Sequence, residues 1–130
     1  MTANKRTPKK NGELLREGES KEQILFVQWL RRNHAKHLVF AIPNGGQRNK
    51  VTAVRLKAEG VTRGVPDLMI PSLALWVEMK TKGGRVSPHQ TEWIDHLRGC
   101  GYVVLVCWSF EDAKRAFLDH LDNFGGRMIY

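Results

Sequence analysis

Apolar residues recur at helical spacing in four parts of the chain, and each part begins with a residue that favours a helix N-terminus. The first part begins at Ser20, which forms the capping-box pattern S-x-x-Q with Gln23. Ser87 begins another such pattern, and Pro88 follows it at the first helical position, where proline is favoured. The predicted helices cover residues 20–37, 49–60, 87–99 and 109–121.

Four other runs lack helical periodicity and are rich in aliphatic, β-branched and aromatic residues, which is typical of strands. Pro71-Ser72 links two of these runs, and this short connection predicts an antiparallel hairpin. The predicted strands cover residues 38–42, 67–70, 75–80 and 102–107. The resulting order α-β-α-β-β-α-β-α predicts an α/β fold with a mixed central sheet flanked by helices.

The length of 130 residues suits one domain with one hydrophobic core. Residues 1–19 are basic and show little apolar periodicity, so we predict a flexible basic tail there, a folded domain at 20–122 and a short C-terminal extension at 123–130. The chain has neither an apolar run that would span a bilayer nor the apolar segment of a secretory signal. We therefore expect a cytoplasmic location, with Cys100 and Cys107 as reduced thiols.

The excess of basic residues gives the first indication of a partner. The sequence has 21 Lys and Arg against 13 Asp and Glu, which is a formal net charge of +8. This balance is typical of proteins that bind nucleic acid, although many basic proteins have no such partner. The histidines never occur at the spacing of a zinc-binding pair, so we expect no zinc site.

Three charged residues interrupt the apolar hairpin. Side chains at i and i+2 share one face of a strand, so Glu78 and Lys80 point the same way, about 7 Å apart. The hairpin would bring Asp67 beside them, and we expect all three at an exposed working edge of the sheet. Two converging carboxylates repel each other, and a hard divalent cation relieves that repulsion. The same pattern also fits a surface strand with a turn aspartate and an ordinary Glu-x-Lys ion pair.

Glu22 offers a further carboxylate at the leading end of the first predicted helix. It lies on the same helical face as Leu25, Phe26 and Trp29, which form the apolar stripe of that helix. A carboxylate in this place can face a site inside the fold. It fits equally well as a capping or helix-dipole group near an N-terminus.

The charged hairpin is one part of a larger set of motifs. The pattern G-x-x-x-G-x-P-D-L at 60–68, followed by E-x-K at 78–80, is much more specific than either half alone. Glu22, the sequence P-N-G-G at 43–46 with Arg48, and a helix containing Gln90 accompany it. Together these motifs resemble the VRR-NUC domain of the PD-(D/E)xK nuclease superfamily, in the stand-alone form found in phages and bacteria. The resemblance covers about residues 20–121 and implies a restriction-endonuclease-like core.

This resemblance implies an endonuclease that uses Mg²⁺ or Mn²⁺ to hydrolyse phosphodiester bonds in DNA. The implied metal ligands are Asp67, Glu78, the main-chain oxygen of Met79, and Glu22 directly or through water. Lys80 would assist the attacking water, and Gln90 would order the site near Lys80.

A set of glycines and cations is expected to contact the DNA. Glycine lets the backbone approach a phosphate closely, and Lys and Arg bind the phosphates themselves. Each of these cations taken alone also fits an ordinary solvated charge. The predicted contacts are Asn44, Gly45, Gly46, Arg48, Lys50, Arg55, Arg63, Lys82 and Arg85.

The function that this resemblance implies is structure-specific cleavage of DNA by a homodimer. The expected substrates are branched, such as a four-way (Holliday) junction or a flap formed in replication, recombination or repair. A homodimer in the cytoplasm of a bacterial or phage-infected cell would suit them, because each of two opposed sites can cut one strand. Two alternatives stay open, a non-catalytic DNA-binding module and a restriction-type endonuclease.

Overall fold

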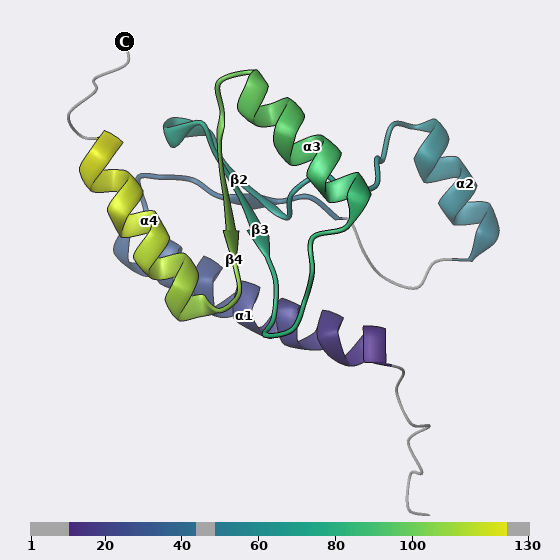
Figure 1. Cartoon of the computed structure of the whole chain (residues 1–130), viewed down its shortest axis with the longest axis horizontal. Helices are drawn as coiled ribbons and strands as arrows, with labels where there is room; N and C mark the ends of the chain where they lie inside the picture. The colour runs from purple at the N-terminus through teal and green to yellow at the C-terminus, as the bar shows by residue number, and fades with distance from the viewer. Residues whose placement is uncertain (1–10, 44–48, 125–130) are drawn as a thin grey trace, which may run out of the picture.

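The computed structural model of the chain describes residues 11–43 and 49–124, and side chains from residue 18 to residue 123 within these ranges. Helices and strands follow one another in the predicted order, with one additional short 3-10 helix (Figure 1). The elements are α1 (Asn11–Asn33), β1 (Phe40–Ala41), α2 (Lys50–Ala58), β2 (Leu68–Ile70), η1 (Pro71–Leu73), β3 (Leu75–Met79), α3 (Pro88–Gly99), β4 (Val103–Cys107) and α4 (Phe110–Phe124). Among these described helices, none is both long enough and apolar enough to cross a membrane.

The strands form one four-stranded mixed sheet in the order β1-β2-β3-β4. The predicted hairpin is confirmed, because β2 and β3 pair antiparallel and Leu68 lies opposite Val77. β1 also pairs antiparallel with β2, whereas β4 pairs parallel with β3. The predicted α/β class is therefore confirmed, and β3 is an internal strand of the sheet.

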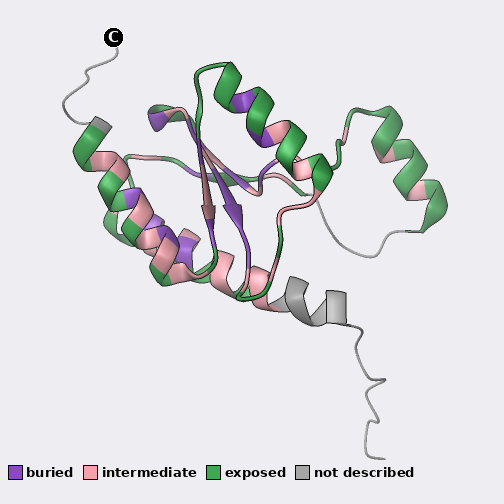
Figure 2. Cartoon of the chain, viewed as in Figure 1, coloured by how far each residue is buried: buried purple, intermediate pink, exposed green. Residues whose placement is uncertain are grey.

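Helices cover both faces of the sheet. Leu75, Val77 and Met79 of β3 are buried in the main core, together with Phe26 of α1 and Phe117 of α4. A second apolar cluster lies on the other face, where α3 packs over β4 and over Trp76 of β3. Figure 1 shows α1 and α4 on one side of the strands and α3 on the other, and Figure 2 shows buried residues along the strands between them. The predicted alternation of β3 side chains between two faces is confirmed.

One consequence of these layers contradicts the sequence analysis. Glu78 and Lys80 are only 2% and 6% exposed, so they do not lie at an exposed edge of the sheet. The physical reason is the parallel pairing of β4 with β3, which places β3 inside the sheet and brings α3 over the face that carries both side chains. The charges lie inside the fold, where water is largely excluded.

The start of the first helix also differs from the prediction. α1 begins at Asn11, so Ser20 lies inside the helix and does not cap it. Strong helix formers such as Leu14, Leu15 and Arg16 precede Ser20 and favour continuing the helix backwards. Residues 11–19 were predicted as part of a flexible tail and belong to α1 instead, whereas residues 1–10 and 125–130 lie outside the described residues.

The other predicted helix starts agree with the structure. Asn49 caps α2 by accepting a hydrogen bond from Thr52 N at 2.8 Å. Ser87 and Gln90 form both hydrogen bonds of a capping box at the start of α3. Ser109 accepts a hydrogen bond from the backbone N–H of Asp112 at 3.0 Å in the first turn of α4. The capping box of Ser87 and Gln90 fixes the first turn of α3, which carries part of the functional site.

Candidate active site

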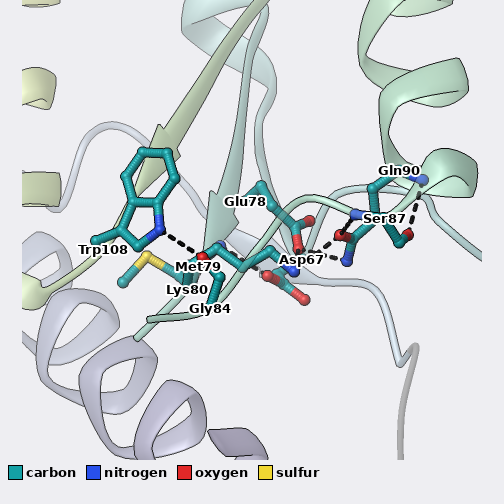
Figure 3. Close-up of polar contacts among 8 residues, drawn as sticks. All are labelled: Asp67, Glu78, Met79, Lys80, Gly84, Ser87, Gln90 and Trp108. Atoms are coloured by element: carbon teal, nitrogen blue, oxygen red, sulfur yellow. Dashed lines mark hydrogen bonds and ion pairs between the residues drawn. The ribbon is translucent and has the colours of Figure 1, made fainter. Parts of the chain in front are cut away.

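Asp67 lies at the mouth of β2 and is held by the two strands beside it. Its main-chain oxygen accepts a hydrogen bond from Ile42 N at 2.8 Å. Its carboxylate oxygen Oδ2 accepts one from Met79 N at 2.7 Å. Because the hairpin register places Leu68 opposite Val77, Asp67 lies across from the end of β3. The expected convergence of Asp67 with the charged residues of β3 is therefore present (Figure 3).

Gln90 of α3 contacts both Glu78 of β3 and Lys80, which directly follows β3. Its side-chain oxygen accepts hydrogen bonds from Lys80 Nζ at 2.8 Å and from Ser87 N at 2.9 Å. Its side-chain nitrogen donates to Glu78 Oε1 at 2.9 Å. Lys80 Nζ itself lies 3.5 Å from Glu78 Oε1. Gln90, which belongs to the capping box of α3, therefore also fixes the positions of the buried Glu78 carboxylate and the buried Lys80 ammonium group (Figure 3).

Burial of two adjacent carboxyl groups changes their protonation. Burial, followed by the neighbouring charge of Asp67, raises the pKa of Glu78 to about 8, although Lys80 opposes this shift. Burial also raises the pKa of Asp67, in spite of the hydrogen bond from Met79 and the charge of Lys80. Without a further cation, the pair retains a proton near neutral pH.

The arrangement fits a hard divalent cation. Glu78 Oε2 is buried and has no hydrogen-bond partner among the described residues, so an acceptor oxygen is left unsatisfied beside a second carboxylate. No group of three or more His, Cys, Asp or Glu suited to a metal ion occurs within residues 18–43 and 49–123. Mg²⁺ is commonly held by one or two carboxylates with water and other oxygen atoms, so a pair is sufficient. The donor set consists of oxygen atoms, as Mg²⁺ and Mn²⁺ prefer.

One carboxylate of α1, that of Glu19, acts on Glu78. Its negative charge contributes to the raised pKa of Glu78, which places it near the site. Glu22 lies one turn further along α1, is partly buried, and has no hydrogen bond or ion pair with the site within the part of the chain that the structure describes. The sequence analysis missed Glu19 because it placed this residue in the tail. An α1 that begins at Asn11 puts Glu19 and Glu22 on one helical face, three residues apart.

The predicted DNA contacts lie in separate places around the carboxylates. Lys50 and Arg55 are exposed on α2, and Arg63 is exposed in the loop that leads to Asp67. Lys82 and Arg85 are exposed in the connection between β3 and α3. The remaining four predicted contacts, at 44–46 and 48, lie outside the described residues.

The β3–α3 connection is held in place by Trp108. The indole Nε1 of this residue donates a hydrogen bond to the main-chain oxygen of Gly84 at 2.9 Å (Figure 3). Gly84 N donates to Thr81 O at 2.8 Å within the same connection. These two bonds order the segment that carries Lys82 and Arg85 beside the site.

Gly64 controls the approach of the Asp67 loop to α3. Its φ is +94°, and a Cβ atom there would lie 2.6 Å from the main-chain oxygen of His89. Gly60 has a similar φ of +103°, but nothing would lie within 4 Å of its Cβ. Gly64 is therefore required both by its backbone conformation and by close packing on the first turn of α3.

We expect Gly64→Ala to lower stability, because the clash with His89 moves the loop that carries Asp67. Gly60→Ala is the matched control, since it introduces the same left-handed strain of about 1–2 kcal/mol without the clash. Urea denaturation of the two variants measures the difference, and Gly64→Ala should lose at least about 1 kcal/mol more. Equal losses in the two variants would show that the close packing does not matter.

Comparison with known proteins agrees with the site. The sequence profile of the VRR-NUC domain matches residues 9–111. A solved structure of a "VRR_NUC domain protein" superposes with a TM-score of 0.67 at 22% identity, covering 80% of this chain and 88% of that one, which shows a shared fold. No curated protein matches the sequence. The profile match extends over most of the chain and includes every residue of the buried acidic site, so the chain belongs to the VRR-NUC family of nuclease domains that act on DNA.

Proposed function

We propose that this nuclease is an endonuclease that depends on Mg²⁺ or Mn²⁺ and cuts branched DNA. The observation that carries the proposal is the pair formed by buried Glu78 and partly buried Asp67. A divalent cation would bind the unsatisfied oxygen of Glu78 and replace the proton that the pair retains. Such an ion, when bound, activates water and offsets charge on a phosphate. Lys80 and Gln90 compensate only Oε1 of Glu78, and a purely structural role would leave its buried Oε2 without a partner among the described residues.

Each residue of the site has a separate part in this proposal. The proposed ligands are Asp67, Glu78, the main-chain oxygen of Met79, and Glu22 directly or through water. Glu19 contributes negative charge beside Glu78 and would favour a bound cation through that charge. Lys80 holds an ammonium group in a site with little water, where it can orient the attacking water or offset charge on the phosphate. Gln90 positions Lys80 and Glu78 through two hydrogen bonds.

The substrate is proposed to be a four-way junction or a flap formed in replication, recombination or repair. The net charge of +8 supports a polyanionic substrate. Exposed cations on α2 and on the β3–α3 connection support contacts with its phosphates. A homodimer acting in a bacterial or phage-infected cell would present two such sites to opposite strands of a junction.

A panel of labelled DNAs tests this function. Linear duplex, flap and four-way-junction DNA are each incubated with the protein in Mg²⁺, in Mn²⁺ or in EDTA. We expect cleavage with either metal ion, none in EDTA, and faster cleavage of a branched DNA than of the duplex. Binding without cleavage in both metal ions would favour a non-catalytic DNA-binding module. Discrete fragments from long duplex DNA would favour a restriction-type endonuclease.

A further inference from the structure

A groove of about 1040 Å³ lies between α2 and α3, outside the acidic site. One wall is formed by α2 and the loop that follows it, and the other by α3 (Figure 1). Neither of the paired carboxylates lines it. The lining residues are Ala53, Leu56, Lys57, Val61, Thr62, Arg63, His89, Glu92, Trp93 and His96.

The lining of this groove combines positive charge with an aromatic ring. Lys57 and Arg63 are exposed cations, and Glu92 is the one acidic residue among the lining residues. Trp93 is partly buried, and His96 packs edge-on against it with ring centroids 5.8 Å apart. Sites for unpaired nucleic acid combine two features. Cations bind the phosphates along the strand, and aromatic rings stack on the bases.

The groove reaches the acidic site through two short connections. Arg63 lies four residues before Asp67 on one loop, and His89 directly precedes Gln90 on α3. Gly64 packs that loop onto the main-chain oxygen of His89, so the two walls meet next to the residues that hold the carboxylates. A strand lying in the groove would therefore continue toward Asp67 and Glu78.

We propose that this groove binds unpaired nucleotides of the strand that is cut, with Trp93 stacking on a base and Lys57 and Arg63 binding its phosphates. This assignment rests on the proposed function and specifies its substrate as DNA with a single-stranded segment beside the cut. In paired DNA the base faces are stacked inside the duplex, so an aromatic face on the protein can stack only on an unpaired base. The apolar part of the wall, which includes Leu56 and Val61, suits the face of an exposed base.

Binding measured without cleavage tests the groove separately from the nuclease activity. The probes are a fluorescent oligothymidine and a fluorescent duplex, both in EDTA, and the proteins are full-length. Trp93→Leu keeps an apolar side chain but removes the stacking surface, and it should weaken oligothymidine binding at least about fivefold. Trp93→Phe should recover part of that loss, and duplex binding by both variants should stay close to that of the wild type.

The double variant Lys57→Gln/Arg63→Gln supplies a second test that does not alter the packing of α3. The slope of log K against log salt for oligothymidine is negative, and it should become less steep by about 1.4. This is about 0.7 for each of the two lost phosphate contacts on a single strand. Arg32→Gln is the matched control, because this exposed cation lies in the last turn of α1 and does not line the groove. Thermal melts establish that each variant is folded, and the double variant decides the question if Trp93→Leu is not.

Two results would overturn the proposal. Equal losses of duplex and oligothymidine affinity would make the groove a site for paired DNA. If the folded variants kept the wild-type affinity and salt slope for oligothymidine, the groove would be shown not to bind nucleic acid. Either result leaves metal-dependent cleavage untouched, and failure of cleavage would leave these binding results intact, so the two proposals fail separately.

Discussion

Asp67→Asn is expected to abolish DNA cleavage while leaving the protein folded. The asparagine side chain has nearly the same shape, and its oxygen can still accept the hydrogen bond from Met79 N. The substitution removes the negative charge that the metal ion needs. A loss of about 4 kcal/mol of transition-state stabilisation corresponds to about 10³-fold in kcat, and we expect at least that decrease.

Single-turnover cleavage of the best branched substrate measures this effect, with a thermal melt to establish folding. Asp95→Asn is the matched control, because it removes a carboxylate from an exposed position on α3. The control should cleave at the wild-type rate. A folded Asp67→Asn protein with wild-type activity would show that the acidic pair is not the catalytic site.

Glu78→Gln is expected to stabilise the metal-free protein at alkaline pH. Folding raises the pKa of Glu78 from 4.5 to about 8, so the folded state binds more protons than the unfolded state between these values. The free energy of unfolding therefore falls as pH rises through this window, by at most about 5 kcal/mol for this one group. Glutamine stays neutral and keeps an amide near Gln90, so the variant should lack this loss.

Urea denaturation of both proteins in EDTA at several pH values measures the difference. The two proteins should be nearly equal in stability near pH 4.5, and the variant should gain steadily toward pH 8. Glu92→Gln serves as the control, since Glu92 is an exposed carboxylate on α3. If the difference in the free energy of unfolding between wild type and Glu78→Gln did not change with pH, the raised pKa of Glu78 would be contradicted.

Local signals in the sequence predicted much of this fold. The caps at Asn49 and Ser87 depend on hydrogen bonds between residues only three positions apart. Their positions could therefore be predicted from the sequence and are confirmed. The hairpin followed from a short connection between two apolar runs. The family could be identified because its motifs around Asp67 and Glu78 are short stretches that can be read directly from the sequence.

Features that depend on distant contacts could not be predicted in this way. The burial of Lys80 results from the parallel pairing of β4 with β3 and from the packing of α3, which no local pattern indicates. The predicted start of the first helix at Ser20 was wrong, because this capping sequence lies within a longer helix that begins at Asn11. That one error also removed Glu19 from the candidate site.

The central claim is a metal site at Asp67 and Glu78. Calorimetric titration of the metal-free protein with Mn²⁺ tests it most directly, when it is repeated in two buffers of different ionisation enthalpy. Metal ligands must be deprotonated, so a carboxyl group with a pKa of about 8 must release its proton when the ion binds. We predict one binding event that releases nearly one proton about one pH unit below 8, about half a proton at pH 8 and progressively less above it, and that is lost in Asp67→Asn. Absence of Mn²⁺ binding by the wild type, or equal binding by Asp67→Asn without proton release, would contradict a metal site at Asp67 and Glu78.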